Sequence, residues 1–272
     1  MFGKMPASFP ISYGTKRPGI VMLAAVRRAR YLLIDISNSF TKLAFASESR
    51  LMRSRRVPTR QFSAAFLAQV LKERKPETVV ISSVVPDRNR SIKSVARGTR
   101  LLWLNAKTNL GVGIEYPKPE TIGADRLANA AAVAELYGYP AIVVDFGTAV
   151  TFDIVSEKRR YIGGVIAPGL EAMTSFLYQR TALLPKLSLE EPRSTVGKST
   201  AGAMMAGAVY GYRGLVREIL QRIRAERFPR QRVKVVATGG YAQLIARQMP
   251  EIESVQPNLT LEGLRIVAGL NP

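Results

Sequence analysis

Two stretches of this chain match in kind: LLIDISNSFTKLAF at residues 32–45 and IVVDFGTAVTFDIV at residues 142–155. Each is an apolar run that ends in an aspartate, passes through a short polar turn and resumes as a second β-rich run. Asp35 aligns with Asp145, and Thr41 aligns with Thr151 at the same offset. We interpret the pair as an internal duplication of a strand–turn–strand unit, in which each copy begins its own α/β half.

The segments after each copy alternate between strand-like and helix-like patterns. After residue 50 the first half is predicted to contain strands over 51–57, 78–82 and 101–104, and helices over 61–72, 88–96 and 124–136. The second half is predicted to contain strands over 141–146, 149–155, 159–163 and 233–237, and helices over 169–179, 200–227 and 241–248. This alternation predicts an α/β fold.

We place the two halves at residues 31–140 and 141–272. Residues 1–30 are expected to form an irregular N-terminal extension, because prolines and glycines interrupt the segment and no hydrophobic period is sustained.

The composition excludes several kinds of catalysis. The 272 residues include 40 Lys and Arg against 20 Asp and Glu, with no His and no Cys, which gives a formal net charge of +20. A chain without imidazole or thiol cannot build a His-based triad, a Cys nucleophile, a structural zinc site or a disulfide. Any catalysis must therefore depend on carboxylates, hydroxyls, Lys, Arg, backbone N–H groups and bound ions.

The 47% share of hydrophobic residues is enough for a compact core. No stretch approaches the roughly 20 apolar residues that span a bilayer. The best N-terminal candidate, residues 19–26, runs directly into Arg27 and Arg28 without a cleavage-like site. We therefore expect a cytoplasmic globular protein with no membrane partner.

The excess of positive charge raises nucleic acid as a possible partner, because clustered Lys and Arg bind phosphates regardless of base sequence. The basic residues gather at 27–30, 53–56 and 213–232, and much of the last group is spaced like the solvent-facing side of a long helix. No interleaved aromatic residues or known reader motif accompany them. We favour a solvated basic surface and do not expect specific nucleic-acid binding.

The repeated hairpin suits the binding of a phosphate chain. An aspartate at the end of a buried strand costs desolvation free energy unless a ligand or ion offsets it. In the pattern D-x-G-x-x-x-T at 145–151, the glycine lets backbone N–H groups approach an anion, and the carboxylate can hold a cation or its water. Two such hairpins facing each other predict a clamp for a metal-bound polyphosphate. The alternative is a pair of ordinary hairpins with satisfied Asx turns.

A third segment, ATGGY at 237–241, runs from a strand into a helix through Gly239 and Gly240. Glycines at such a junction let a flat ring or a sugar approach the backbone, so we assign the segment to the nucleoside end of the same nucleotide. By itself the motif is weak, because two glycines also make an ordinary sharp turn between a strand and a helix.

Seven segments follow one another in a distinctive order. They are DISNSFTK at 35–42, IGADRLANA at 122–130, VVDFGTAVTFD at 143–153, GGVIAPGL at 163–170, VGKST at 196–200, ATGGY at 237–241 and LTLEGL at 259–264. This order resembles the type III pantothenate kinases, which belong to the actin-like superfamily of acetate and sugar kinases, and the resemblance runs from residue 31 to the end of the chain.

The resemblance implies two duplicated ribonuclease H-like halves, each a mixed five-stranded sheet with flanking helices, and a nucleotide cleft between them. It implies ATP-dependent phosphorylation of the primary hydroxyl of pantothenate to 4'-phosphopantothenate, the first step toward coenzyme A. The alternative on the same fold is a non-catalytic regulatory protein of the transcription accessory type.

The resemblance also implies roles for individual residues. The ATP phosphates would be lined by Asp35, Ile36, Ser37, Asn38, Ser39, Phe40, Thr41 and Lys42, with Thr148 as a second nucleotide contact. Pantothenate would be surrounded by Tyr116, Gly123, Ala124, Asp125, Arg126 and Thr200. Asp125 would be the catalytic base, and Asp145 would hold a monovalent cation, potassium or ammonium, besides the Mg²⁺ carried by ATP. The family completes its site across a homodimer interface, so a homodimer is expected.

The chemistry of these residue types agrees with the implied roles. Phosphoryl transfer depends mainly on alignment and charge neutralisation, for which neither His nor Cys is needed. Asp125, at the start of the helix predicted over 124–136, can accept a hydroxyl proton, although the helix dipole alone also favours an aspartate there. Arg126 suits a substrate carboxylate, although it could also be an ordinary surface arginine.

The first hairpin departs from the family pattern, which has Gly where this chain has Ser37 and Thr where it has Ser39. Ser39 keeps a hydroxyl. At Ser37, a Cβ in a turn built for close phosphate approach could clash or require an unusual φ angle. We therefore predict reduced affinity for ATP without loss of activity.

Gly197, Lys198 and Ser199 end like a P-loop, but the first glycine of that motif falls on Pro192, which has no N–H to donate. The preceding residues, KLSLEE at 186–191, would also make a poor buried strand. We reject a P-loop at this position.

Overall fold

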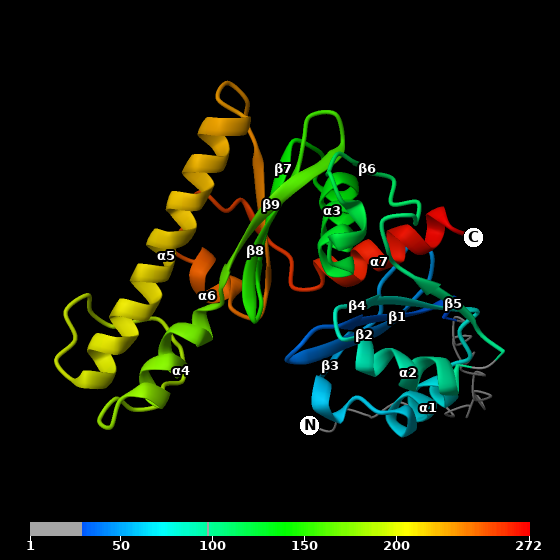
Figure 1. The fold of residues 1–272 in the computed structure, drawn as a ribbon, viewed down its shortest axis with the longest axis horizontal. Coiled ribbons are helices and arrows are strands. Elements are labelled where there is room, and N and C mark those ends of the chain that lie inside the picture. Colours follow the sequence, from blue (N-terminus) through cyan, green and yellow to red (C-terminus); the bar gives the residue numbers. More distant parts are fainter. Residues whose placement is uncertain (1–28, 97) are drawn as a thin grey trace, which may run out of the picture.

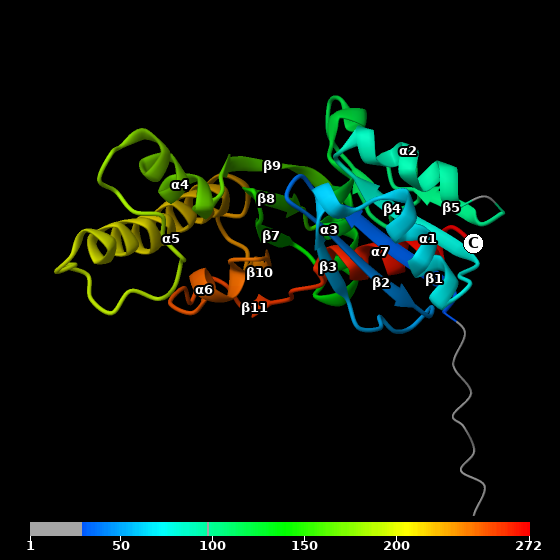
Figure 2. The ribbon, with the colours of Figure 1, turned by 90° about the horizontal axis from the view of Figure 1, so that it is seen from below.

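The computed structural model describes residues 29–96 and 98–272, and the irregular extension expected over residues 1–30 lies almost wholly outside this range. The described chain forms two β-sheets with helices between and around them (Figures 1 and 2).

The first sheet has five strands in the order β3–β2–β1–β4–β5. Their bounds are β1 Tyr31–Ile36, β2 Phe40–Ala46, β3 Arg55–Pro58, β4 Thr78–Ser83 and β5 Arg100–Trp103. β1 pairs antiparallel with β2 and parallel with β4. All six residues of β1 are buried, because apolar clusters cover both faces of this strand. A central strand buried on both faces is typically a continuous apolar run, and Asp35 is the one exception in this strand.

The second sheet has six strands in the order β11–β10–β7–β8–β9–β6. Their bounds are β6 Gly113–Ile114, β7 Ala141–Phe146, β8 Ala149–Val155, β9 Arg160–Pro168, β10 Lys234–Gly239 and β11 Ser254–Val255. β7 pairs antiparallel with β8 and parallel with β10. The order and directions from β9 to β11 therefore repeat those from β3 to β5, and β6 is added beyond β9. The predicted duplication is confirmed.

The two repeated hairpins differ in the length of their turns. Asp35 pairs with Lys42, whereas Asp145 pairs with Thr151, so the first turn is one residue longer than the second. The alignment of Thr41 with Thr151 is therefore wrong, because the strand register matches Thr151 with Lys42. A shift of one residue places a side chain on the opposite face of a sheet, which is why Thr41 faces the core.

The helices fill the space between the sheets and cover their outer faces. They are α1 Ala64–Glu73, α2 Pro86–Val95, α3 Ala124–Leu136, α4 Leu170–Arg180, α5 Thr200–Arg227, α6 Ala242–Ala246 and α7 Leu259–Leu270, with 3-10 turns at Thr59–Gln61 and Pro119–Thr121. α3 and α7 pack against each other between the sheets, and α1 and α2 cover the far side of the first sheet (Figure 1). In the described part of the chain, no helix combines the length and apolar composition needed to cross a membrane.

The observed bounds match the sequence patterns for α3, α5, β7 and β8. β9 runs on to Pro168, beyond the predicted end at residue 163, and α6 ends before residue 248. The patterns assigned no helix to α7. Most of α7 is buried between the two sheets, but its less buried residues Glu262, Arg265, Ile266 and Gly269 are spaced three or four apart, so the helical pattern was present and was missed.

The proposed division of the chain at residue 140 stays a prediction. β6, which precedes that residue, hydrogen-bonds with β9 of the second sheet. α7, at the end of the chain, packs against β1 and β4 of the first sheet. The two halves are therefore linked by elements from both sides of the boundary.

One arginine of the basic group at 213–232 is buried and paired inside the fold. Arg213 is buried, and its terminal nitrogens donate to both carboxylate oxygens of Glu191 at 2.9 and 2.7 Å. It also donates to the carbonyl oxygens of Leu244 and Ile245. Arg213 therefore does not belong to the solvent-facing set, because it anchors the segment before α5 to α5 and α6.

Candidate active site

The turns of the two repeated hairpins meet between the sheets (Figures 1 and 2). The hydroxyl oxygen of Ser39, after β1, lies 2.8 Å from that of Thr148, after β7. Both residues are exposed, as is Asn38. The tertiary structure thus brings the two predicted phosphate-binding turns together.

Asp35, at the end of β1, is 4% exposed. Ser82, from β4, donates a hydrogen bond to its Oδ1 at 3.0 Å. Burial, together with the charge of Asp125, raises the pKa of Asp35 to about 7, and the charge of Asp145 acts in the same direction. The ammonium of Lys42 and the Ser82 hydroxyl oppose that rise in pKa. Asp35 is therefore influenced by the negative charge of two other carboxylates, Asp125 at the start of α3 and Asp145 at the end of β7.

Asp145 occupies the equivalent place at the end of β7. Asn129 of α3 donates from Nδ2 to Asp145 Oδ2 at 3.2 Å, and Thr260 of α7 donates to Asn129 Oδ1 at 2.9 Å. Burial raises the pKa of Asp145, and Lys42 and Asn129 oppose the rise. The carboxylate is thus oriented by a chain of hydrogen bonds that passes through both central helices.

Asp125 lies in the first turn of α3, one helical turn before Asn129, so the two side chains share a face of the helix. Its Oδ1 accepts a hydrogen bond from the backbone N–H of Arg126 at 2.9 Å. Burial and the charge of Asp145 raise the pKa of Asp125. A carboxylate with a raised pKa is a better proton acceptor near neutral pH.

Arg126 begins a second group of residues beside Asp125. Its Nε donates to Asp153 Oδ1 at 2.6 Å, and its guanidinium lies 5.7 Å from the centroid of the Tyr161 ring. The ring of Tyr116 meets that of Tyr161 edge to face at 6.2 Å. Tyr116, which is 38% exposed, and Arg126 therefore both pack against the ring of Tyr161.

Several residues of the first hairpin face the core rather than the turn. Ile36 and Thr41 are fully buried, and the Thr41 hydroxyl lies 3.1 Å from that of Thr59. Their side chains cannot reach a ligand in the turn, so only their backbone could line the phosphates. The ring of Phe40 is covered by Arg56 at 3.5 Å.

Ser37 closes the first turn without backbone strain. Its N–H donates to the carbonyl oxygen of Phe40, and its own carbonyl accepts from the Thr59 hydroxyl. Among the described non-glycine residues, Arg159 alone has a positive φ angle. The unusual φ considered for Ser37 is therefore absent. Of the two effects considered, only a steric clash between its Cβ and a bound phosphate remains.

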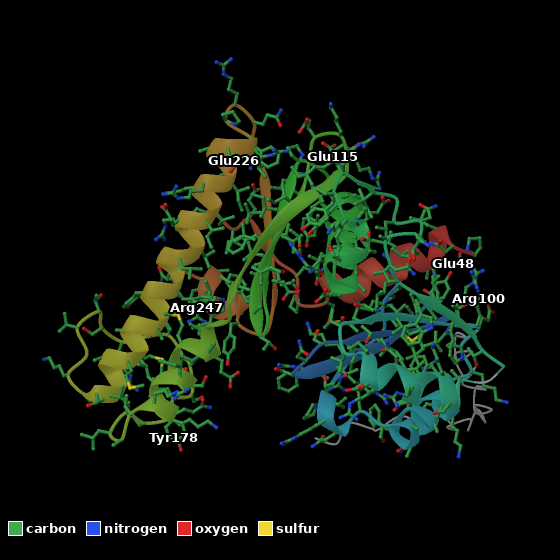
Figure 3. All side chains as sticks on the ribbon, viewed as in Figure 1. Glu48, Arg100, Glu115, Tyr178, Glu226 and Arg247 are labelled. Carbon is green, nitrogen blue, oxygen red and sulfur yellow. The ribbon has the colours of Figure 1, made fainter. Side chains whose placement is uncertain are left out.

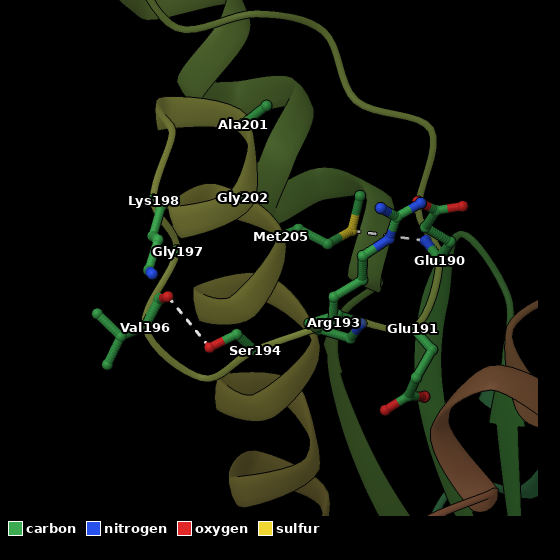
Figure 4. A pocket seen from close by; sticks show the side chains of 11 residues that line it. Glu190, Glu191, Arg193, Ser194, Val196, Gly197, Lys198, Ala201, Gly202 and Met205 are labelled. Carbon is green, nitrogen blue, oxygen red and sulfur yellow. Dashed lines mark hydrogen bonds between the residues drawn. The ribbon is translucent and has the colours of Figure 1, made fainter.

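Thr200 is not brought to the other predicted residues. It is the exposed first residue of α5, and α5 starts at the outer end of the projection formed by α4 and α5 (Figure 1). A pocket of about 380 Å³ lies there, between residues 190–198 and the first turns of α5 (Figure 4). Its lining does not include Asp35, Asp125 or Asp145. The structure describes every residue between α4 and α5, and none of them forms a strand. A P-loop connects a strand to a helix, so the rejection of a P-loop at Lys198 is confirmed.

Asp35, Asp125 and Asp145 supply carboxylate oxygens, which Mg²⁺ prefers as ligands. Within residues 29–96 and 98–272, no three or more acidic side chains are already gathered as a metal cage. This arrangement fits a divalent ion that arrives on the ATP phosphates and takes one or two carboxylates from the protein. The raised pKa values of Asp35 and Asp145 fit the same view, because a nearby cation would favour their charged forms.

Sequence reasoning missed Asn129, Ser82 and Asp153. Asn129 and Asp153 are both fully buried, and each interrupts an otherwise apolar stretch, ANAAA and TFDIV. A lone polar side chain in such a stretch requires a partner when buried, so this signal was available. Ser82 gave no comparable signal, because a serine near the end of a strand is common.

Two sheets of one topology, each with an aspartate at the end of its first strand, define the actin-like ATPase and sugar kinase class of folds. Two solved structures agree. The TM-score is 0.59 with a Baf family protein from Campylobacter jejuni, at 20% identity over 89% of this chain and 98% of that chain. It is 0.50 with an inorganic polyphosphate/ATP-glucomannokinase from Arthrobacter sp. strain KM, at 15% identity over 90% of this chain and 100% of that chain. At these identities the likeness shows the fold alone.

The sequence comparisons identify the particular family. The family model described as type III pantothenate kinase matches residues 31–222. The chain is 51% identical over 243 residues to the type III pantothenate kinase of Akkermansia muciniphila, and the aligned region covers 89% of this chain and 99% of that protein. It is 43% identical over 236 residues to that of Methylacidiphilum infernorum, with 87% of each covered. The chain belongs to the type III pantothenate kinase family.

Proposed function

We propose that this protein transfers the γ-phosphoryl group of ATP to the primary hydroxyl of pantothenate, yielding ADP and 4'-phosphopantothenate in the first step of coenzyme A biosynthesis. The observation that carries the proposal is the 2.8 Å contact between the hydroxyls of Ser39 and Thr148, which joins the turns that follow the two strands carrying Asp35 and Asp145. The alternative of a non-catalytic regulatory protein gains no support from the curated relatives, which carry the kinase name.

In this reaction the pantothenate hydroxyl oxygen forms a bond to the γ-phosphorus, and the bond from that phosphorus to the β–γ bridging oxygen breaks. Asp125 receives the hydroxyl proton, and ADP leaves with the electrons of the broken bond. Arg126 binds the pantothenate carboxylate, which keeps the hydroxyl directed toward Asp125. Tyr116 covers the substrate, and Gly123 and Ala124 line it from the start of α3.

The nucleotide lies across the two hairpin turns, with the exposed residues Asn38, Ser39 and Thr148 facing the phosphates. Lys42 adds positive charge, since it acts on both Asp35 and Asp145. Asp35 takes the Mg²⁺ that accompanies ATP, and Asp145 holds the monovalent cation, potassium or ammonium. These cations neutralise phosphate charge when bound.

The active unit in this proposal is a homodimer. Thr200 lies away from Asp125 in the same chain, so a second copy is needed to bring it to the substrate. α4 and α5 offer a surface for such a contact. Met173, Phe176 and Tyr178 of α4 are 38%, 60% and 48% exposed, and Tyr178 lies at the outer end of the projection (Figure 3).

One assay tests the proposed reaction. Purified protein is incubated with ATP, pantothenate and Mg²⁺, with potassium present or withheld, and 4'-phosphopantothenate is measured by mass spectrometry. We expect product that depends on both Mg²⁺ and potassium. Absence of product with either potassium or ammonium would refute the kinase assignment for this chain.

A mixing experiment tests the homodimer. Asp125→Asn and Thr200→Val variants are each expected to lose most activity, and mixing them should restore activity because each mixed dimer has one site with both native residues. A monomer by light scattering, or no recovery after subunit exchange, contradicts the shared site.

A cytoplasmic location stays a prediction of the sequence.

A further inference from the structure

Asp153 is a fully buried carboxylate that the reaction described above does not use. It lies on β8, and three side chains donate to it. Arg126 Nε lies 2.6 Å from its Oδ1, the Tyr161 hydroxyl lies 3.4 Å from the same oxygen, and the Thr151 hydroxyl lies 3.3 Å from its Oδ2. Both carboxylate oxygens are therefore hydrogen-bonded, and one of them orients Arg126.

The guanidinium of Arg126 is held on several sides. The side chain is 13% exposed, and the Tyr161 ring packs against it. A Cβ on Gly164 would lie 1.9 Å from the Phe152 carbonyl oxygen and 2.4 Å from Arg126 Nη2, so the guanidinium lies close to the Gly164 backbone. The side chain is thus fixed in one orientation rather than free in solvent.

Arg126 Nη2 is buried and has no hydrogen-bond partner in the protein. A buried unpaired donor costs free energy, and native proteins rarely leave one without a reason. Because Asp153 takes the Nε proton, the terminal nitrogens remain for another acceptor. A carboxylate fits the planar donors of a guanidinium best.

We propose that Asp153 is a positioning residue for substrate recognition: it engages Nε of Arg126 and so leaves the terminal nitrogens for the carboxylate of the substrate. This inference rests on the proposed function, in which Arg126 binds pantothenate. Asp153 itself does not touch the substrate. Its effect is selectivity for an acid over a neutral alcohol of the same shape.

The rival explanation is an ion pair that only joins α3 to β8. The two explanations differ in their effect on selectivity. Loss of a purely structural pair lowers the melting temperature and affects all substrates alike, whereas loss of a positioning residue changes the preference for a carboxylate. The informative quantity is therefore the ratio of kcat/KM for pantothenate to kcat/KM for pantothenyl alcohol, in which a neutral CH2OH replaces the carboxylate.

The main variant is Asp153→Asn, which keeps the shape of the side chain and removes its charge. We expect the selectivity ratio to fall at least tenfold, through a higher KM for pantothenate, while the KM for ATP stays within twofold of wild type. The ratio does not depend on the concentration of folded enzyme, so partial loss of stability does not affect it. An unchanged ratio would overturn the proposal even if the melting temperature falls.

Two further variants separate the explanations. Glu251→Gln removes another carboxylate that pairs with an arginine at 2.7 Å, here Arg217 of α5, and should leave the ratio unchanged. In an Arg126→Ala background, Asp153→Asn should have no further effect on the ratio, because Asp153 acts through Arg126. A further tenfold fall in that background would contradict the proposal.

If Asp153→Asn yields no folded protein, Thr151→Val removes the hydroxyl that donates to Asp153 Oδ2 while nearly preserving volume. The ratio should then fall at least twofold, and an unchanged ratio overturns the proposal. Failure of the proposed function would give a different result from failure of this inference. In that case wild-type protein phosphorylates neither substrate and, by calorimetry, binds pantothenate no more tightly than the alcohol.

Discussion

The hydroxyl oxygens of Ser39 and Thr148 lie 2.8 Å apart, although the two residues belong to turns of different sheets. A phosphate placed between these turns would replace their mutual hydrogen bond with one bond from each hydroxyl. In the proposed function, this contact is the point at which the two duplicated hairpins would bind one ligand.

Removal of the first of these hydroxyls should weaken ATP binding. We expect Ser39→Ala to raise the KM for ATP about 2- to 10-fold, the effect of one hydrogen bond worth about 0.5–1.5 kcal/mol, and to leave the KM for pantothenate unchanged. Initial rates at varied ATP check this. Ser94→Ala, on the exposed side of α2, is the matched control, and an equal change there would remove the turn from the explanation.

Asp125 and Lys198 distinguish the proposed site from a P-loop. Asp125→Asn should lower kcat by at least about 100-fold, because the side chain can no longer accept the hydroxyl proton. Lys198→Ala should retain most activity, because Lys198 is exposed in the segment before α5 and no strand precedes it. Steady-state rates of both variants decide the matter, and the reverse order of effects would favour the P-loop.

The burial of Asp35 should make ligand-free protein less stable at neutral pH. Its pKa is raised from 3.8 to about 7, so the folded state holds the proton more tightly than the unfolded state. Between these values the free energy of unfolding falls as pH rises. Asp35→Asn removes this loss and should stabilise the ligand-free protein at pH 8 by a few kcal/mol, since one pKa unit is worth about 1.4 kcal/mol.

Urea unfolding at pH 8 and pH 4 checks this prediction, and the advantage of Asp35→Asn should shrink at the lower pH. The same variant should lose catalytic activity, because an amide cannot hold the Mg²⁺ of ATP as a carboxylate does. A variant that is less stable than wild type at both pH values would show that Asp35 is stabilised in its charged form.

Two adjacent glycines provide a matched pair. Gly239 has a φ of +94°, and a Cβ there would lie 2.6 Å from Asp145 Oδ1 and from the backbone of Phe146. At Gly240 the nearest atom to a Cβ is Arg56 Nη2, at 3.7 Å. Gly239→Ala should therefore lower stability by more than about 2 kcal/mol, and Gly240→Ala should be tolerated. Calorimetric melting of both variants tests this, and similar melting temperatures would contradict it.

Ser37→Gly should separate affinity from stability. Without the Cβ at the phosphate turn, the KM for ATP should fall, in line with the reduced affinity predicted for Ser37. Because Ser37 does not have a positive φ, glycine relieves no strain and should cost about 0.5–1 kcal/mol of stability through a freer unfolded chain. Rates and melting temperatures measure the two effects separately. Wild-type protein that is inactive until glycine is restored would contradict the prediction of retained activity.

Much of the fold was predictable because its signals are local. The runs at β1 and β7 are apolar and β-rich, and the turn residues follow directly, so both hairpins were recognisable from the sequence. α3 and α5 were predicted at their observed bounds, since helical spacing is visible over many residues. α7 was not predicted, although Glu262, Arg265 and Gly269 mark a less buried side at helical spacing.

The candidate site was only partly predictable. Asp35, Asp125 and Asp145 could be proposed from the motifs that contain them. Asn129 and Asp153 act through partners that are distant in sequence, as in the hydrogen bond from Thr260 to Asn129. Register was equally hidden, because the one-residue difference between the hairpin turns appears only when the strands are paired.

The sequence by itself determined the duplication, the family resemblance, the absence of imidazole and thiol chemistry and the carboxylates available for catalysis, since all of these depend on residue identity and local order. Only the tertiary structure decided that Ser39 meets Thr148, that Thr41 faces the core, that Arg126 is held by Asp153 and that Thr200 lies far from Asp125. Those outcomes depend on strand register and helix packing. Both are set by contacts between segments that are distant along the chain, and such contacts produce no local sequence pattern.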